Sequence, residues 1–126
     1  MKNDFRHYCF ITLFSIDEIS TVNLVDNDLS DNQILRAEQL LKNTKDNLDT
    51  ILHILEKNSL NWSVERIGKA EKTSLMLGIS EIMLNLSPYK VIVSEWTKLT
   101  DKHASSDAAK FGNAILDNIS KNHEFT

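Results

Sequence analysis

The chain has 126 residues, of which three are Gly, one is Pro and one is Cys, and its formal net charge is −4 at pH 7. This length suits one domain over residues 1–126, and the scarcity of Gly and Pro argues against a turn-rich β fold. The negative charge excludes a basic field over the whole surface, so nucleic acid would need a local patch. The sequence has no apolar run of membrane-spanning length and no signal-peptide pattern, and a lone cysteine cannot form an internal disulfide, so we expect a cytoplasmic protein.

Apolar residues recur at helical spacing from Phe5 to about Asp17 and predict the first helix. Cys9 belongs to this apolar stripe and is interpreted as a small core residue. The following segment, residues 18–31, is rich in Asp, Asn and Ser. It is expected to form a loop that holds at most one short helical turn.

Ser30 and Gln33 have the spacing of a capping box and mark the start of a second helix. Apolar residues at spacings of three and four continue from there to Asn58, which predicts one long amphipathic helix of about 26 residues. Thr44 interrupts the apolar stripe of this helix. A break or a change of face between residues 43 and 46 is therefore an alternative.

Residues 69–85 are apolar on almost every side of the helix that they are expected to form, which is typical of a helix at the centre of a bundle. A narrow stripe of small and acidic residues interrupts this apolar surface. Two uses of the stripe are open: close approach of another protein chain, or tight packing inside the bundle. The stripe consists of Glu71, Ser74, Gly78, Glu81 and Asn85.

Two further helices are expected in the last third of the chain. Ser87 and Pro88 are typical of a helix start, with Ser as the N-cap and Pro at the first helical position, and this helix continues to about Lys102. Ser105 is the expected cap of the last helix. Trp96 is interpreted as a core residue, because aromatic residues at helical spacing usually lie in the core.

The helical pattern covers most of the chain, and a short helical piece is also expected near residues 63–67. The sequence therefore predicts an all-α fold, a bundle of about six or seven helices. Two N-terminal helices, within residues 1–58, are expected to pack on a C-terminal group of three or four helices, within residues 59–126.

The sequence contains no recognised pattern for catalysis or for metal binding. It has no glycine-rich phosphate loop, no nucleophile elbow and no Cys-x-x-Cys pair. Its histidines are not paired at the spacing of metal ligands. We therefore expect no enzymatic activity, no cofactor and no metal site. The histidines are His7, His53, His103 and His123.

Three ordered runs in the C-terminal half carry a more specific signal. The run from Arg66 to Met83, with Glu81 placed late, resembles the central helix of a known family. Residues 88–95 read Pro-Tyr-Lys-Val-Ile-Val-Ser-Glu and resemble that family's Pro-Tyr-Lys-Val-Ala-Ile-Asn-Glu. Residues 107–117 resemble its Asp-Ser-x-Lys-Phe-Val-Asn-Gly-Val-Leu-Asp, at the same separation and without a gap. On these runs the chain is identified as similar to the bacterial NusB family of transcription antitermination factors.

This resemblance implies an all-α binding protein without catalytic activity. It implies two ligands: NusE, a small-subunit ribosomal protein that doubles as an elongation factor, and the boxA element of nascent RNA. Together these would help the RNA polymerase antitermination complex pass terminators, notably on ribosomal RNA operons. A homodimer that buries the same basic patch is a further hypothesis.

The resemblance also implies which residues meet the two ligands. In the first helix, two cations match the family's arginine-rich stretch, and Thr12-Leu13-Phe14 resembles the family's Ala-Leu-Tyr. Phe111 has two open readings, stacking on an RNA base or packing in the core. The stripe described above matches the NusE-binding positions at Glu71 and Glu81. The implied RNA-binding residues are Lys2, Arg6, Phe14, Tyr89, Lys90, Asp107, Lys110 and Phe111.

Asp4 stands within the N-terminal stretch where the family carries arginines, and its charge is of the opposite sign. Each lost phosphate contact weakens RNA binding and flattens its salt dependence. An alternative function is therefore a protein-interaction module of the NusB fold whose RNA binding is weakened or lost.

Overall fold

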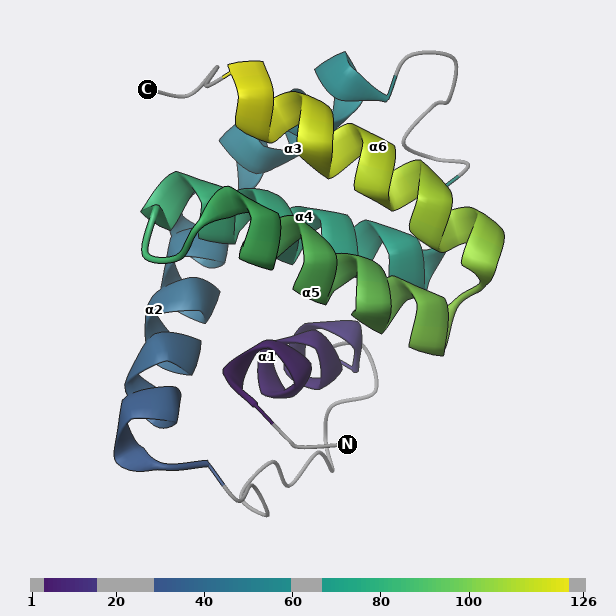
Figure 1. Ribbon diagram of the computed structural model, residues 1–126. Helices are drawn as coiled ribbons and strands as arrows, with labels where there is room; N and C mark the ends of the chain where they lie inside the picture. The colour runs from purple at the N-terminus through teal and green to yellow at the C-terminus, as the bar shows by residue number, and fades with distance from the viewer. Residues whose placement is uncertain (1–3, 16–28, 60–66, 123–126) are drawn as a thin grey trace.

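The computed structural model describes residues 4–15, 29–59 and 67–122, and within these ranges it contains six helices and no strand (Figure 1). The predicted all-α fold is therefore confirmed. The predicted loop after the first helix, the helical piece near residues 63–67, Lys2 and His123 lie largely or wholly outside the described residues. The helices are α1 (Phe5–Phe14), α2 (Asp31–Asp46), α3 (Leu48–Asn58), α4 (Lys69–Leu84), α5 (Tyr89–His103) and α6 (Ser106–Asn122).

Helix α4 lies at the centre of the bundle and contacts each of the other five described helices. In Figure 1, α5 lies in front of α4, with α6 above and α1 below. This position follows from the sequence, because a helix that is apolar on nearly every side has to be covered on nearly every side. Nine of the ten residues from Thr73 to Ile82 in α4 are buried, and the exception is Met76. The central helix was thus predicted correctly.

The predicted long helix from residue 31 to Asn58 is wrong as a single element, because it divides into α2 and α3 at Asn47. The Asn47 side-chain amide donates to the carbonyl of Asn43 at 3.0 Å, and a side chain that competes for a helix carbonyl favours termination. Thr44, the weak point of the stripe, is buried and donates through Oγ1 to the Leu40 carbonyl at 2.7 Å. The break directs α3 onto α4 and α6.

The capping box at the start of α2 forms only in part. Ser30 Oγ accepts from the backbone N–H of Gln33 at 3.3 Å, as expected. The Gln33 side chain does not return to Ser30; its Oε1 accepts from the backbone N–H of Phe5 at 2.8 Å. The other cap of α1 is Asp4, which accepts from the His7 N–H at 2.9 Å. One side chain of α2 therefore fixes where α1 begins.

Helices α5 and α6 run antiparallel and are joined by a short turn. The start of α5 differs by one residue from the expectation, since Pro88 is the N-cap and no side chain caps this helix. The predicted cap of α6 is confirmed, because Ser105 Oγ accepts from the Ala108 N–H at 3.0 Å. Because of this arrangement, the first turn of α6 lies beside the end of α5, and Tyr89 at the start of α5 lies beside Lys121 near the end of α6.

Candidate nucleic-acid interface

Arg6 is buried at the contact between α1 and α4, although it was predicted to face RNA. Its Nε donates to Glu81 Oε1 at 2.8 Å, and its Nη2 donates to Glu81 Oε2 at 2.7 Å. The exposed fractions of the two side chains are 9% and 4%. The prediction that Arg6 contacts phosphate is contradicted, because its guanidinium is enclosed and already engaged by a carboxylate in bidentate geometry.

Trp96 completes this buried group from α5. Its indole Nε1 donates to Glu81 Oε1 at 2.8 Å, so one carboxylate accepts from two other helices. Burial works to lower the pKa of Arg6, but the hydrogen bonds and the charge of Glu81 outweigh it and raise that pKa. The interpretation of Trp96 as core is confirmed. Arg6, Glu81 and Trp96, hereafter the buried triad, join α1, α4 and α5.

The small and acidic stripe of α4 does not form a partner surface. Ser74 and Glu81 are 1% and 3% exposed, and Gly78 is buried. A Cβ on Gly78 would lie 3.0 Å from both terminal methyl groups of Leu116 in α6. The packing alternative therefore explains these three residues, and the prediction that they bind a partner is wrong because neighbouring helices cover them.

The two ends of this stripe remain accessible. Glu71 is half-buried in the first turn of α4. Asn85 is exposed and ends α4 in the left-handed conformation, with φ 53°. Asn tolerates this conformation better than most residues, so its local role is that of a helix C-cap. Partner binding by Glu71 and Asn85 stays a prediction.

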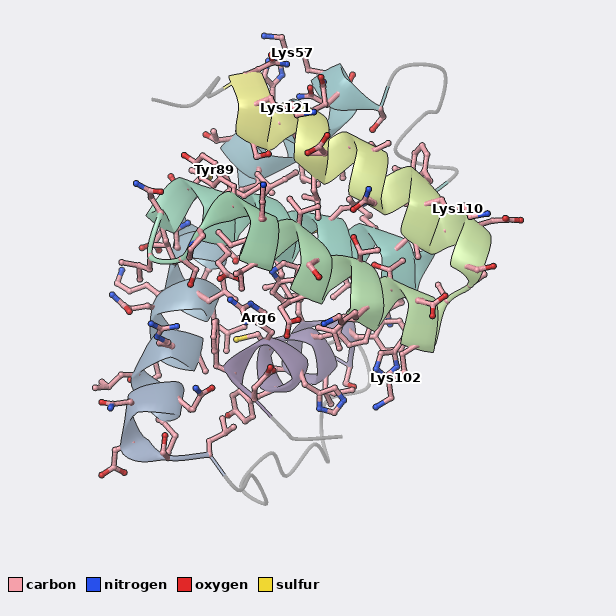
Figure 2. All side chains as sticks on the ribbon, viewed as in Figure 1. Arg6, Lys57, Tyr89, Lys102, Lys110 and Lys121 are labelled. Carbon is pink, nitrogen blue, oxygen red and sulfur yellow. The ribbon has the colours of Figure 1, made fainter. Side chains whose placement is uncertain are left out.

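The first turns of α6 bring three predicted RNA-binding residues to one end of the bundle. Asp107 and Lys110 are exposed, and Lys110 forms no ion pair within the part of the chain that is described. Figure 2 shows Lys110 at the start of α6, pointing away from the bundle. Phe111 is half-buried and packs against the core. The ring is thus anchored by the core while part of it stays accessible.

The end of α1 lies at the same end of the molecule. Phe14 is half-buried and stacks on Phe10, with ring centroids 5.4 Å apart. The ammonium of Lys69, in the first turn of α4, lies 4.9 Å from the Phe14 ring centroid. Helices α4 and α6 run parallel, since Gly78 faces Leu116 and Gly112 faces Leu75, so their first turns lie together.

Two aromatic rings and three exposed lysines therefore share one end of the bundle. The third lysine, Lys102, lies in the last turn of α5 on the same side as Lys110 (Figure 2). Lysine ammoniums can hold phosphates and half-exposed rings can stack on bases, which is the usual combination in single-strand recognition. We call this group the lysine end: Phe14, Lys69, Lys102, Lys110 and Phe111.

A pair of histidines lies at the contact of α1 with the end of α5. The rings of His7 and His103 stack with centroids 5.7 Å apart, and Phe10 stacks on His103 at 4.6 Å. His103 Nε2 is buried and has no hydrogen-bond partner among the described residues. Burial lowers the pKa of both histidines, and Lys102 adds to the effect. Sequence reasoning missed this pair, because the two histidines are far apart in the chain and no local pattern shows that their rings meet.

Tyr89 lies far from the lysine end, at the opposite end of the α5–α6 surface (Figure 2), and Lys90 follows it in the first turn of α5. They line a groove of about 680 Å³ between these two helices. Three lysines border it, Lys90, Lys98 and Lys121, and sequence reasoning had named only the first. The periodicity of each helix shows which lysines share one of its faces. Only the register between α5 and α6 shows that these two faces meet in one groove.

No group of three or more metal-ligating side chains is found in the described ranges. None of the helices described is long and apolar enough to cross a membrane. Cys9 is fully buried, its Sγ donates to the Ala37 carbonyl at 3.4 Å, and burial raises its thiol pKa. Its interpretation as a small core residue is confirmed.

Taken together, the described helices form an all-helical bundle that gathers accessible lysines and half-buried aromatic rings at one end and along one groove, the surface chemistry of a binding protein. The sequence profile of the NusB family matches residues 6–121. The chain belongs to the NusB family, whose members are non-enzymatic transcription antitermination factors.

Relatives and one solved structure agree with this assignment. The transcription antitermination protein NusB of Fervidobacterium nodosum is 31% identical over 124 residues, 97% of this chain and 82% of the relative. That of Clostridium botulinum is 30% identical over 103 residues, 79% of this chain and 77% of the relative. A chain in a structure titled "Crystal Structure of a Plectonemic RNA Supercoil" superposes with a TM-score of 0.84 at 24% identity, covering 97% of this chain and 95% of that chain. This likeness confirms the NusB-like fold.

Proposed function

We propose that this protein is a cytoplasmic adaptor that binds boxA-type single-stranded RNA of ribosomal RNA operons together with the ribosomal protein NusE. The lysine end carries this proposal, because exposed Lys110 stands next to the half-buried ring of Phe111. The family membership supports it, since family members act in transcription antitermination.

The chemistry of the lysine end suits single strands. Lys69, Lys102 and Lys110 can hold phosphates, while Phe14 and Phe111 offer faces on which bases stack. Because Arg6 is enclosed in the buried triad, it cannot add a phosphate contact in this conformation. With few contacts, the affinity for RNA alone should be low and only weakly dependent on salt.

A basic partner would supply the phosphate-binding cations that this chain lacks. The net charge of −4 favours association with a basic ribosomal protein such as NusE. Two predicted partner residues, Glu71 and Asn85, are accessible to it. In this view the RNA is held jointly, by the lysine end and by the cations of NusE.

The alternative is a NusB-fold interaction module that binds NusE and has lost RNA binding. The burial of Arg6 favours it, because one of the two N-terminal cations expected to hold phosphate serves the core instead. The two functions differ in one observable, the presence of RNA in the complex with NusE.

Fluorescence anisotropy with a labelled boxA-type RNA, with and without NusE, tests the proposal. We expect binding that NusE strengthens and that Lys110→Glu weakens by about tenfold. Lys45→Glu is the matched control, because it makes the same charge change at an exposed position on α2. Binding of NusE without RNA would favour the interaction module, and no binding of either ligand would contradict both functions.

A further inference from the structure

The groove between α5 and α6 is a hollow that the lysine end does not explain. It has a volume of about 680 Å³ and follows α5 from Tyr89 to Lys98 and, on the other side, α6 from Asn113 to Lys121. Its walls are mostly apolar, and Val93 and the half-buried Tyr89 contribute to them. A mostly apolar hollow with a few polar groups is the usual form of a ligand site. Its polar lining residues are Lys90, Ser94, Thr97, Lys98, Asn113, Asp117, Ser120 and Lys121.

Positive charge gathers along this groove, although the chain as a whole is acidic. Its lining contains three lysines and one carboxylate, Asp117. Lys98 pairs with Glu95 at 3.0 Å and Lys121 pairs with Asp117 at 2.9 Å, but these two lysine side chains are 66% and 72% exposed. Exposed ion pairs of this kind are weak, so both lysines can turn toward an anion that enters the groove.

Lys90 completes the cationic border, because it is exposed and forms no ion pair among the described residues. With Tyr89 beside it, the start of α5 offers one ammonium and one aromatic ring. This repeats, at the other end of the same two helices, the combination found at the lysine end.

Hydrogen-bonding groups lie between these two ends. Thr97 Oγ1 donates to the Val93 carbonyl at 2.7 Å and lies 3.2 Å from Asn113 Oδ1, which links α5 to α6 at the end of the groove nearer the lysine end. No hydrogen bond among the described residues uses the side-chain NH₂ of Asn113, so this group remains available to a ligand. An amide N–H₂ donates well to carbonyl and ring-nitrogen acceptors on the edges of bases.

We propose that the α5–α6 groove binds a second stretch of the same RNA, single-stranded and next to the stretch held at the lysine end. This inference rests on the proposed function. A strand that leaves Lys110 can follow α5, a helix of 15 residues or about 22 Å, to reach Tyr89. The occupant is RNA and not a basic protein, because three lysines at the border would repel the latter.

Two RNAs that share one boxA-type core, of 6 and 16 nucleotides, test this inference in titrations with NusE present. The groove variant is Lys90→Gln/Lys98→Gln/Lys121→Gln, which removes three charges from exposed positions. The control is Lys42→Gln/Lys45→Gln/Lys57→Gln on α2 and α3, which removes the same three charges from exposed positions and also breaks an exposed ion pair, Lys42–Asp46.

We expect the parent and the control to bind the long RNA about tenfold more tightly than the short RNA, and the groove variant to bind both alike. For the long RNA, the slope of log affinity against log salt should fall by about 2 in the groove variant, since each phosphate contact on a single strand adds about 0.7. Equal binding of both RNAs by the parent, or an intact preference for the long RNA in the groove variant, would overturn the inference while leaving the proposed function standing. Absence of binding to either RNA would contradict both.

A cross-link gives an independent readout of the occupant. A 4-thiouridine placed outside the core of the long RNA should cross-link to α5 near Tyr89, and the groove variant should lose this product. A cross-link from the groove to NusE in place of RNA would also overturn the inference.

Discussion

The contact of α1 with α4 and α5 and the surface shared by α5 and α6 both carry charged residues, yet they use charge in opposite ways. In the first region, Arg6 meets Glu81 in the interior and donates to both of its carboxylate oxygens. In the second, Lys90 and Lys110 face solvent and form no ion pair in the described ranges. A cation of the expected type is therefore a ligand-binding residue only where the fold leaves it accessible.

Energetics explain why the two regions differ. A buried charge has to be matched closely, because removing one partner leaves an uncompensated charge at low dielectric. An exposed lysine loses little when it has no partner in the chain, and it can exchange water for phosphate when RNA arrives. The buried triad thus holds the helices together, and the exposed lysines remain available for binding.

The largest effect is expected from breaking the buried triad. Arg6→Met should lower the free energy of unfolding by about 3–5 kcal/mol, because it leaves the Glu81 carboxylate buried beside Trp96 alone. The double variant Arg6→Met/Glu81→Leu should recover most of this loss. Urea unfolding followed by circular dichroism measures both, with Lys42→Ala at an exposed ion pair as the control. A loss from Arg6→Met no larger than that from the control would mean that the pair is not a structural element.

Two glycines sharpen the distinction between packed and accessible positions. Gly78→Ala should destabilise the protein by about 1–3 kcal/mol, because the new methyl group meets buried Leu116 at 3.0 Å. Gly112→Ala meets only Leu75, at an ordinary 3.5 Å, and should be neutral or stabilising by up to about 1 kcal/mol through helix propensity. The thermal unfolding temperature should therefore fall for Gly78→Ala and stay level or rise for Gly112→Ala. Equal destabilisation would show that α4 and α6 do not pack as described.

Phe111 tests the accessible region. Phe111→Leu keeps an apolar side chain against the core but removes the aromatic face, so RNA affinity should fall by about 1–3 kcal/mol. Stability should change by less than about 1.5 kcal/mol, because Phe111 is only half-buried and Leu keeps most of its apolar contact with the core. Anisotropy titration measures the RNA affinity of this variant, and urea unfolding measures its stability. A large loss of stability with unchanged affinity would assign the ring to the core alone.

A smaller effect is expected from pH at the histidine pair. The pKa of His103 is lowered in the folded protein, by burial first and then by His7 and Lys102, so the unfolded chain takes up the proton more readily. Stability is thus fully present above the ordinary pKa of about 6.5 and falls as pH drops below it toward the folded value. Asp4 opposes this shift at His7. His103→Gln should flatten the decline in urea midpoint between pH 7.5 and 5, with the exposed His53→Gln as the control; an unchanged decline would exclude the pair as its source.

Sequence reasoning succeeded where the signal is local. Helical spacing located the central helix, and Ser105 marked the start of α6, because a cap needs only residues within one turn. The division at Asn47 was predicted only as an alternative, between residues 43 and 46. Competition between a side chain and the helix carbonyls causes it, and such competition is only weakly visible in the apolar spacing of the sequence.

The candidate site was harder to predict, because the burial of a side chain and the register between two helices depend on the whole fold. Arg6 was assigned to RNA because it matches the family's arginine-rich stretch, and nothing nearby in the sequence shows that it meets Glu81. Gly78 suits a partner surface and a packed interior equally well, since both need a small residue. The groove required the antiparallel register that places Lys121 beside Tyr89.

One titration tests the central claim most directly: that accessible lysines, and not the buried pair, bind RNA. It compares Arg6→Met/Glu81→Leu with Lys110→Glu, both confirmed as folded, against a boxA-type RNA with NusE present. The account expects the double variant to bind within about twofold of the parent and Lys110→Glu to bind about tenfold more weakly. A folded double variant that loses RNA binding while Lys110→Glu retains it would contradict the account.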